Sequence, residues 1–243
     1  MSTWVWAGTI FFLGNLINIF YITVLYHRGL AHGAVKLGPF SKWLVKHTGV
    51  WITGIDPKAW TCMHRHHHMY SDTDRDPHSP NRFGIFGVAV GQLRSYEETL
   101  RRLIKRDKKY TKIVKDIDFD VSYLNRNKIW WLPTLFHIAI SVGLFFAFNS
   151  VLVGAAYYVG IMSHPVHGWM VNSLAHRFGY RNYDTDDNST NNQLVSWLVF
   201  GEGLQNNHHA FPKSANFAKK RGEVDLGYLL CRIAAGFRLV RMN

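Results

Sequence analysis

Residues 64–68 read HRHHH, and the rest of this 243-residue chain is best understood outward from that run. His64, His67 and His68 have spacings of three and four, so an α-helix places them on one face. Neutral imidazole is the commonest nitrogen ligand of iron, zinc and copper, and imidazoles crowded in this way favour a bound metal. His66 points elsewhere on the helix and is expected to support a ligand or to face solvent.

Three further clusters extend the pattern, and they contain His27 and His32, then His176, then His208 and His209. Eight imidazoles exceed what one metal can hold, so the count predicts two metals close together. His27 and His32 can turn toward one point if a helix ends between them, which Gly29 permits. Alone, that pair could equally be interfacial, and His176 could be a packing residue. Because adjacent side chains diverge, His208 and His209 are expected to serve different metals.

Apolar segments adjoin the clusters. Residues 4–26 are almost wholly apolar, and at about 1.5 Å per residue they can cross a bilayer core of about 30 Å. Residues 129–148 and 151–171 are predicted to span as a pair joined by Asn149-Ser150. The shorter segment 43–55, which contains Lys46 and His47, is predicted to lie at the membrane interface or to be re-entrant.

The net charge of +12 comes from Lys and Arg residues that flank the apolar segments, and no nucleic-acid-binding motif is present. This distribution favours a membrane over nucleic acid as the partner. The basic stretch 94–115 and the basic tail after His176 are predicted to be cytoplasmic. All four clusters then lie on the cytoplasmic face. With only Cys62 and Cys231, a disulfide framework and a thiolate zinc site are excluded.

The sequence therefore predicts an all-α integral membrane protein. It is expected to be a single membrane-embedded domain, residues 1–243, with three to four transmembrane helices. A cytoplasmic helical cap, residues 60–128 and 176–243, is expected to hold the histidine-rich site.

The clusters also resemble those of a known family in order and spacing. HRGLAH begins at residue 27, HRHHHMYSDTDRDPH at 64, VNSLAHRFGYRNYD at 171 and GEGLQNNHHAFP at 201. From about His27 to Pro212 the chain resembles the membrane fatty-acyl desaturases of the stearoyl-CoA type, whose histidine-rich site holds two iron ions. The resemblance implies an oxidoreductase that uses O2 and cycles Fe2+/Fe3+ to introduce a cis double bond into a saturated acyl chain.

The resemblance also implies a division of the ligands. One iron is expected to be held by His27, His32, His64, His68 and His209. The other is expected to be held by His67, His176 and His208, with a water tied to Asn172. The family's ninth histidine is replaced here by Gln205, so the second iron is expected to bind more weakly, keep an extra water or use the amide oxygen.

Other side chains are expected to support this chemistry. Trp60 matches a tryptophan that lines the family's acyl tunnel, although tryptophan is also common at membrane interfaces. The nearby carboxylates are expected to orient ligand histidines or to be solvated, and they are Asp72, Asp74, Asp76 and Glu202. No side chain beyond the metal ligands is expected to be catalytic, because an unactivated C–H bond offers no acidic proton.

Substrate linkage and partners stay open. The family's animal members carry an Arg-Asp pair that helps bind coenzyme A, and Cys62-Met63 stand there in this chain. A CoA ester, a carrier protein or a membrane lipid could supply the acyl chain. Electrons must come from an external ferredoxin, rubredoxin or cytochrome b5-like donor, since no haem, flavin or iron–sulfur motif is present. The alternatives are a di-iron membrane hydroxylase and, more remotely, a non-catalytic metal-binding membrane protein.

Overall fold

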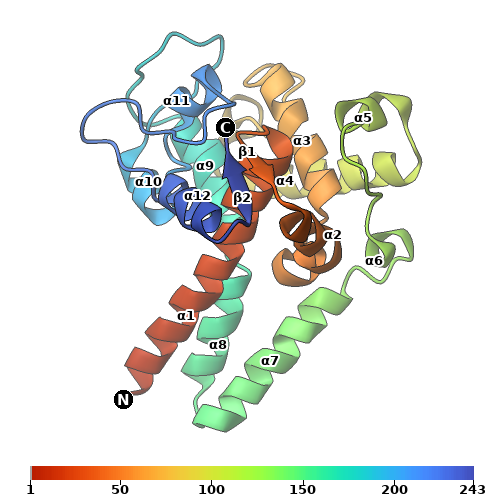
Figure 1. Ribbon diagram of the computed structural model, residues 1–243, viewed down its shortest axis with the longest axis vertical. Coiled ribbons are helices and arrows are strands. Elements are labelled where there is room, and N and C mark those ends of the chain that lie inside the picture. The colour runs from red at the N-terminus through yellow and green to blue at the C-terminus, as the bar shows by residue number, and fades with distance from the viewer. Residues whose placement is uncertain (1) are drawn as a thin grey trace.

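The computed structural model describes residues 2–243, which fold into helices with one small sheet (Figure 1). The helices are α1 (Thr3–Ile19), its π-helical continuation η1 (Phe20–Ala31), α2 (Pro39–Thr53), α3 (Pro57–Tyr70), α4 (Pro80–Ile104), α5 (Lys108–Ile113), α6 (Tyr123–Arg126), α7 (Leu132–Phe148), α8 (Val151–Ile161), α9 (His164–Ser173), the 3₁₀ turn η2 (Leu174–His176), α10 (Gln193–Leu198), α11 (Gln205–Ala210) and α12 (Leu226–Gly236). Strands β1 (Val35–Leu37) and β2 (Val240–Met242) pair antiparallel. The mostly helical fold agrees with the prediction.

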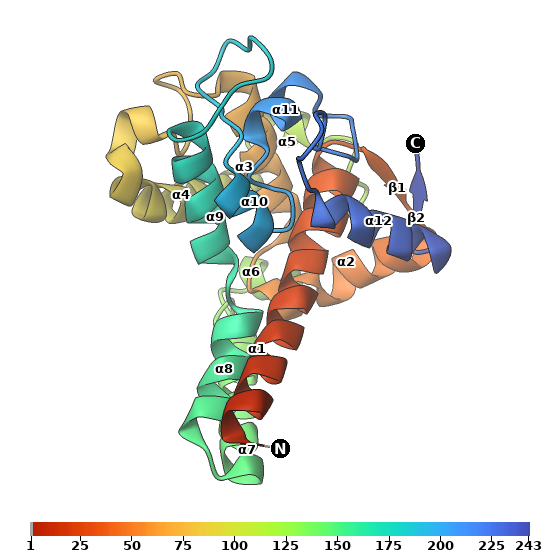
Figure 2. The same cartoon turned by 90° about the vertical axis from the view of Figure 1, so that its left-hand side faces the viewer.

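Three helices, α1, α7 and α8, form a stalk that extends away from a larger cap built from the other elements (Figure 2). Glycines allow α1 and α8 to approach closely: a Cβ at Gly14 would lie 3.0 Å from the Ile161 backbone nitrogen. Asn149, in the left-handed conformation at φ 46°, turns the chain from α7 into α8. Backbone contact at small residues thus holds the stalk together.

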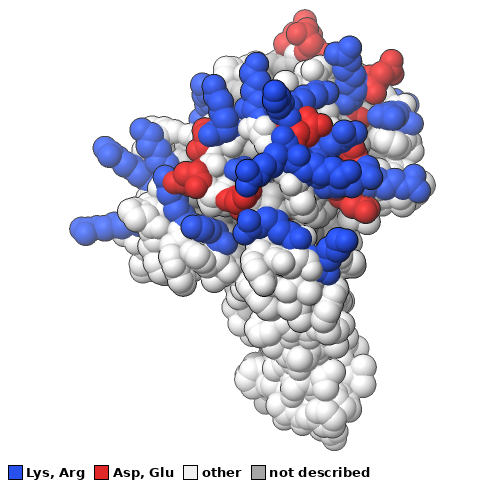
Figure 3. All heavy atoms as spheres, turned by 90° about the vertical axis from the view of Figure 1, so that its right-hand side faces the viewer, with Lys and Arg blue, Asp and Glu red and all other residues white. Residues whose placement is uncertain are grey.

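The surface of the stalk carries no Lys, Arg, Asp or Glu, because residues 3–26 and 129–176 contain none (Figure 3). The Lys and Arg side chains gather on the cap instead. Within the described chain, one helix, Thr3–Ala31, is long and apolar enough to cross a membrane. Helices α7 and α8 are apolar but have 17 and 11 residues. The count of three to four spans therefore stays a prediction.

The predicted span 151–171 is not one continuous helix. The chain breaks after Ile161 into α8 and α9. Pro165 in the first turn of α9 cannot continue the preceding hydrogen-bond ladder. Polar side chains of α1 compensate at the break: Asn18 Nδ2 donates to the Ile161 carbonyl at 2.8 Å, and Ser163 Oγ donates to Asn15 Oδ1 at 2.9 Å. These bonds explain two asparagines inside an apolar segment.

The core of the cap packs η1 against α2, α3 and α12 around residues that include Val24, Tyr26, Cys62 and Cys231. Helix α3, which carries the HRHHH run, begins at Pro57, and the side chain of its N-cap, Asp56, accepts hydrogen bonds from two backbone N–H groups at 3.0 Å. This cap and core fix the helix from which the site is built.

Candidate metal centre

His27 and His32 approach each other because the chain winds as a π-helix between them. In an α-helix, residues five apart point about 140° away from each other. In η1 the hydrogen bonds close over five residues, and His32 N donates to His27 O at 3.1 Å. The ring centroids lie 5.0 Å apart. The expected end of the helix at Gly29 is wrong: the helix continues to Ala31 and is wider.

Five histidines from three separate elements form the first group. Their ligand nitrogens all lie within 4.8 Å of one another, and the members are His27, His32, His64, His68 and His208. The Nε2 atoms of His27 and His208 are 3.0 Å apart, and those of His32 and His64 are 2.8 Å apart. Helix α3 supplies two members one turn apart, as the sequence predicted.

Three histidines form the second group, which consists of His67, His176 and His209. The Nε2 atom of each is buried and has no hydrogen-bond partner within the described chain. Three buried nitrogens without partners, gathered within 4.8 Å, suit a shared metal ion. His209 also stacks on His68 with centroids 4.3 Å apart, so the two groups are adjacent.

The expected division of His208 and His209 is corrected by this geometry. His208 lies with the five-histidine group, and His209 lies with His67 and His176. The two side chains do diverge, because neighbours on the short helix α11 point about 100° apart. The packing of α11 against the cap decides which of the two histidines faces which group. Two adjacent histidines in the sequence do not indicate that orientation.

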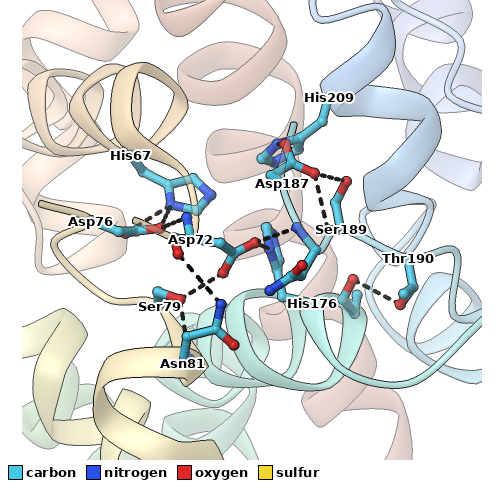
Figure 4. A network of polar contacts seen from close by, with 12 residues as sticks. His67, Asp72, Asp76, Ser79, Asn81, His176, Asp187, Ser189, Thr190 and His209 are labelled. Carbon is cyan, nitrogen blue, oxygen red and sulfur yellow. Dashed lines mark hydrogen bonds and ion pairs between the residues drawn. The ribbon is translucent and has the colours of Figure 1, made fainter. Parts of the chain in front are cut away.

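Four carboxylates accept hydrogen bonds from Nδ1 of histidines in the two groups, and Figure 4 shows the three pairs made by His67, His176 and His209. The pairs are His27 with Glu202 at 2.6 Å, His67 with Asp76 at 2.9 Å, His176 with Asp72 at 2.9 Å and His209 with Asp187 at 2.6 Å. Each bond fixes the ring and leaves Nε2 with a lone pair for a metal. Asp74 contacts no histidine in the described chain. The sequence reading missed Asp187, which lies outside the quoted motifs.

Burial favours the neutral form of several rings in the site, whereas the pKa of His67 is raised, because the carboxylates of Asp76, Asp72 and Asp187 outweigh the effect of its burial. Burial, and then the neighbouring imidazoles, lower the pKa of His32, His64, His68 and His208 well below the usual range. Burial by itself would raise the pKa of Asp76, but attraction to His67 outweighs it and lowers that pKa. Neutral imidazoles beside carboxylates are the protonation state that metal binding requires.

Arg28 connects the first group to the C-terminal part of the cap. Its buried guanidinium donates to Glu202 at 2.5 Å and to both oxygens of Asp225 at 3.0 Å. It also lies 3.8 Å over the ring of Phe217, which packs against His208 with centroids 4.5 Å apart. Because Glu202 also receives the His27 hydrogen bond, Arg28 holds together parts of the site that are far apart in sequence.

A cavity of about 310 Å³ reaches the first histidine group at His27 and His64. Trp60 lines it and stacks on His64 with parallel rings 5.0 Å apart. Asn172 and Gln205 also line it, and the Gln205 amide nitrogen donates to the Glu202 carbonyl at 2.7 Å. That bond leaves the amide oxygen of Gln205 as the atom for a metal or a water. Apolar side chains on η1, α3, α4 and α9 line much of the remainder.

His78 is a further buried histidine that the sequence reading did not single out. Its ring stacks on His67 with centroids 4.7 Å apart, it lines the cavity, and neither ring nitrogen has a partner in residues 2–243. The signal was available, because His78 ends the quoted HRHHHMYSDTDRDPH motif two residues after Asp76. His66 points away from both groups, toward Tyr70 and Tyr110.

Residues 2–217 match the family model described as fatty acid desaturase. The chain is 31% identical to the sn-1 stearoyl-lipid 9-desaturase of Anabaena variabilis, with 94% of this chain and 89% of that protein covered. It is 33% identical to the Delta-9 acyl-lipid desaturase 1 of Arabidopsis thaliana, with 87% and 66% covered. It is 30% identical to the icosanoyl-CoA 5-desaturase of Limnanthes douglasii, with 90% and 60% covered.

The chain thus spans 60% of the length of the Limnanthes relative and 89% of the length of the Anabaena relative. The family match includes every histidine of both groups, and the relatives act on fatty acyl chains according to their names. Histidine groups able to hold metal ions, beside an apolar cavity, agree with that membership. The chain belongs to the fatty acid desaturase family.

Proposed function

We propose that this protein is an O2-dependent fatty-acyl desaturase that introduces a cis double bond into a saturated acyl chain at a di-iron centre. The observation that carries the proposal is the pair of adjacent histidine groups, of which the first reaches a cavity through His27 and His64 and four rings are oriented by carboxylates. Membership of the desaturase family supports the same reaction.

In this proposal the two groups are the ligands of two iron ions. The first iron is held by His27, His32, His64, His68 and His208, and the second by His67, His176 and His209. Asn172 and Gln205 act through water or a weak amide contact at the cavity side. The unpartnered Nε2 atoms of the second group favour this assignment, since buried polar atoms normally have partners.

When bound, the irons supply with O2 the oxidising power needed to remove two hydrogens from unactivated methylenes. The chain itself orients the imidazoles through Glu202, Asp72, Asp76 and Asp187 and excludes water by burial. Trp60 lies where it can hold an acyl chain against the histidines. Positioning one pair of methylenes is the protein's task.

Partners and location follow from the same proposal. An external ferredoxin, rubredoxin or cytochrome b5-like protein supplies electrons, and the basic surface of the cap suits an acidic donor (Figure 3). The stalk sits in the membrane with the histidine groups on the cytoplasmic side. Coenzyme A, a carrier protein or a membrane lipid carries the acyl chain.

The test is expression in a cell that lacks its own desaturases, with double bonds in the lipids located by mass spectrometry. New double bonds are expected, together with two irons per purified chain. His67→Ala should abolish the double bonds and reduce the iron content, because His67 belongs to the second group, whereas His47→Ala, an exposed histidine outside both groups, should change neither. An acyl product that gains one oxygen would instead identify a hydroxylase. A purified protein without iron whose His67→Ala variant behaves like wild type would exclude the proposal.

A further inference from the structure

A second, open pocket of about 450 Å³ lies where β1, β2 and the end of α12 meet, and it shares no lining residue with the cavity at the histidines. Three of its lining residues are the cations Lys36, Arg238 and Arg241, and none of the described residues around it is Asp or Glu. All three side chains are exposed, and within residues 2–243 none of them takes part in an ion pair. Three cations around one pocket without a counter-ion create a positive potential that attracts an anion.

The register of the small sheet places two of these cations directly opposite each other. β1 and β2 pair antiparallel with Lys36 facing Arg241. Like charges at opposed positions of a sheet destabilise the pairing. The strands cannot slip by one residue to separate the charges, because the slip would expose the buried side chains of Val35 and Val240. An anion held between Lys36 and Arg241 would replace their repulsion with two attractions.

The backbone at Arg238 favours a different residue. Arg238 follows Phe237, the C-cap of α12, and has the left-handed conformation with φ 57°. Glycine is the usual residue at such a position, because a Cβ is strained there. The conformation therefore does not account for an arginine, whereas its side chain supplies the third cation of the pocket.

Exposed aromatic rings beside the pocket indicate the kind of anion. Phe237 precedes Arg238 and is 75% exposed, and Phe40 at the start of α2 is 58% exposed. Phe40 stacks on Trp43, which is also exposed, with ring centroids 6.1 Å apart. Aromatic side chains mixed with Lys and Arg are typical of surfaces that contact a membrane at the level of its lipid phosphates. A small soluble phosphate compound would need no such apolar border.

Helix α2 connects the pocket to the stalk. At its first turn, the Leu239 carbonyl accepts hydrogen bonds from the Gly38 backbone N–H at 3.0 Å and from Ser41 Oγ at 2.6 Å. At its last turn, the Trp51 carbonyl accepts a hydrogen bond from His137 Nε2 of α7 at 2.7 Å. Helix α2 thus lies along the edge of the cap from which the stalk extends (Figures 1 and 2), and Lys and Arg side chains gather at that border (Figure 3). With the stalk in a membrane, this edge meets the lipid head groups.

We propose that Lys36, Arg238 and Arg241 bind the phosphate group of an anionic membrane lipid, whose acyl chains pack beside Phe40 and Phe237. The inference goes beyond the proposed function and rests on the proposed membrane location of the stalk. Arginine binds phosphate oxygens through two parallel hydrogen bonds, which suits Arg238 and Arg241 to this group. The lipid is a structural ligand and not the substrate, since its pocket is separate from the cavity at the histidines.

The first test follows the thermal unfolding of the whole chain, purified in detergent, during titration with phosphatidylglycerol. Phosphatidylcholine and inorganic phosphate are titrated in parallel. Phosphatidylglycerol should raise the unfolding midpoint at concentrations at which neither of the other two does so. Equal stabilisation by phosphatidylcholine would mean that the anionic charge is not recognised, and stabilisation by inorganic phosphate alone would mean that the lipid is not. Either result overturns the proposal.

Arg238→Gly separates lipid binding from folding. Glycine fits the left-handed backbone at this position, so the variant should be about as stable as wild type without lipid. Its affinity for phosphatidylglycerol should fall about fivefold, the contribution of one cation near an anionic membrane. Arg106→Gly is the matched control, because Arg106 is exposed, has φ 56° and lies outside the pocket. Equal losses of affinity in the two variants would overturn the proposal.

Arg241→Glu tests the opposed charges. It faces Lys36 with a carboxylate, so it should raise the unfolding midpoint without lipid and lower the affinity for phosphatidylglycerol at least about tenfold. Lys36→Glu should do the same, whereas both substitutions together restore like charges and should lower the midpoint again. A lipid response of Arg241→Glu equal to that of wild type contradicts the proposal. If that variant instead loses only the turnover driven by a reduced acidic ferredoxin, the pocket binds the electron donor and the lipid assignment is wrong.

Discussion

His209 illustrates how single side chains shape the centre. Its Nδ1 lies 2.6 Å from Asp187 Oδ2, and its buried Nε2 faces His67 and His176 without a partner. Burial, partly offset by Asp187, lowers the pKa of His209 to about 4, so the ring is neutral near neutral pH. A carboxylate behind a ligand fixes its tautomer and raises its affinity for a metal. Asp187 should therefore contribute to metal binding through His209, although it is not itself a ligand.

Asp187→Asn is expected to weaken iron binding at the second group by about 10- to 100-fold, the usual effect of losing such a carboxylate. Chelator titration of the purified protein, followed by iron analysis, measures this directly. Asp186→Asn is the matched control, because Asp186 is exposed and contacts no histidine in the described structure. Equal iron affinity in the two variants would contradict the role of Asp187.

Arg28 contributes through buried charge. Arg28→Met would leave Glu202 and Asp225 buried without their cation, and it should lower the free energy of unfolding by about 3–5 kcal/mol. Denaturant unfolding in detergent gives the value. Arg232→Met, at an exposed arginine of α12, should change it little. Arg28→Lys keeps the charge but loses the forked geometry of the guanidinium. Its loss of unfolding free energy should lie between those of Arg28→Met and Arg232→Met. A variant of Arg28 as stable as wild type would show that the carboxylates find other partners.

Gln205 stands where the resemblance of the sequence motifs predicts a ninth histidine. Gln205→His should tighten binding of the second iron by at least about tenfold, because imidazole is a better iron ligand than an amide oxygen. The midpoint of iron loss during chelation reports the change. Loss of iron at the same chelator concentration as wild type would mean that position 205 does not reach the metal.

At the scale of elements, the stalk depends on close contact between α1 and α8. A Cβ at Gly160 would overlap the Phe11 carbonyl, whereas one at Gly143 on α7 would meet nothing within 4 Å. Gly160→Val should therefore lower the free energy of unfolding in detergent by about 1–3 kcal/mol through overpacking. Gly143→Val should have a much smaller effect. Similar losses in both variants would show that the helices are not in contact as described.

The π-helical winding of η1 is the element that matters most for the site. It continues α1 without a break and turns His27 and His32 toward one point, while α3 needs only ordinary α-helical spacing to do the same for His64 and His68. One long helix thus carries both an apolar segment and two candidate ligands. The site is placed at the end of that segment because the helix is continuous.

At the scale of the whole molecule, the two histidine groups join segments that are distant in sequence. Residues of η1, α3, η2 and α11 meet there, so bound metal should stabilise the folded protein strongly. Removing iron with a chelator should lower the free energy of unfolding by about 3 kcal/mol or more, and adding Fe2+ should restore it. Thermal unfolding before and after chelation measures this. An unchanged transition would indicate that the fold holds the histidines without metal.

The sequence by itself determined the helical fold, the order of the clusters and the identity of the eight histidines that gather at the site, because helical spacing and family motifs are local properties of the chain. It also identified Glu202, Asp72 and Asp76 as carboxylates near the ligands. These features need only a few neighbouring residues to be recognised.

Tertiary structure alone decided the finer geometry. Which group receives His208 and which receives His209 depends on the docking of α11, and the break after Ile161 depends on Asn18 from another helix. Asp187 reaches His209 from a loop 22 residues away in sequence. Such contacts join side chains whose spacing in the sequence follows no helical or strand period. They form only when the elements pack together, so the sequence alone does not predict them.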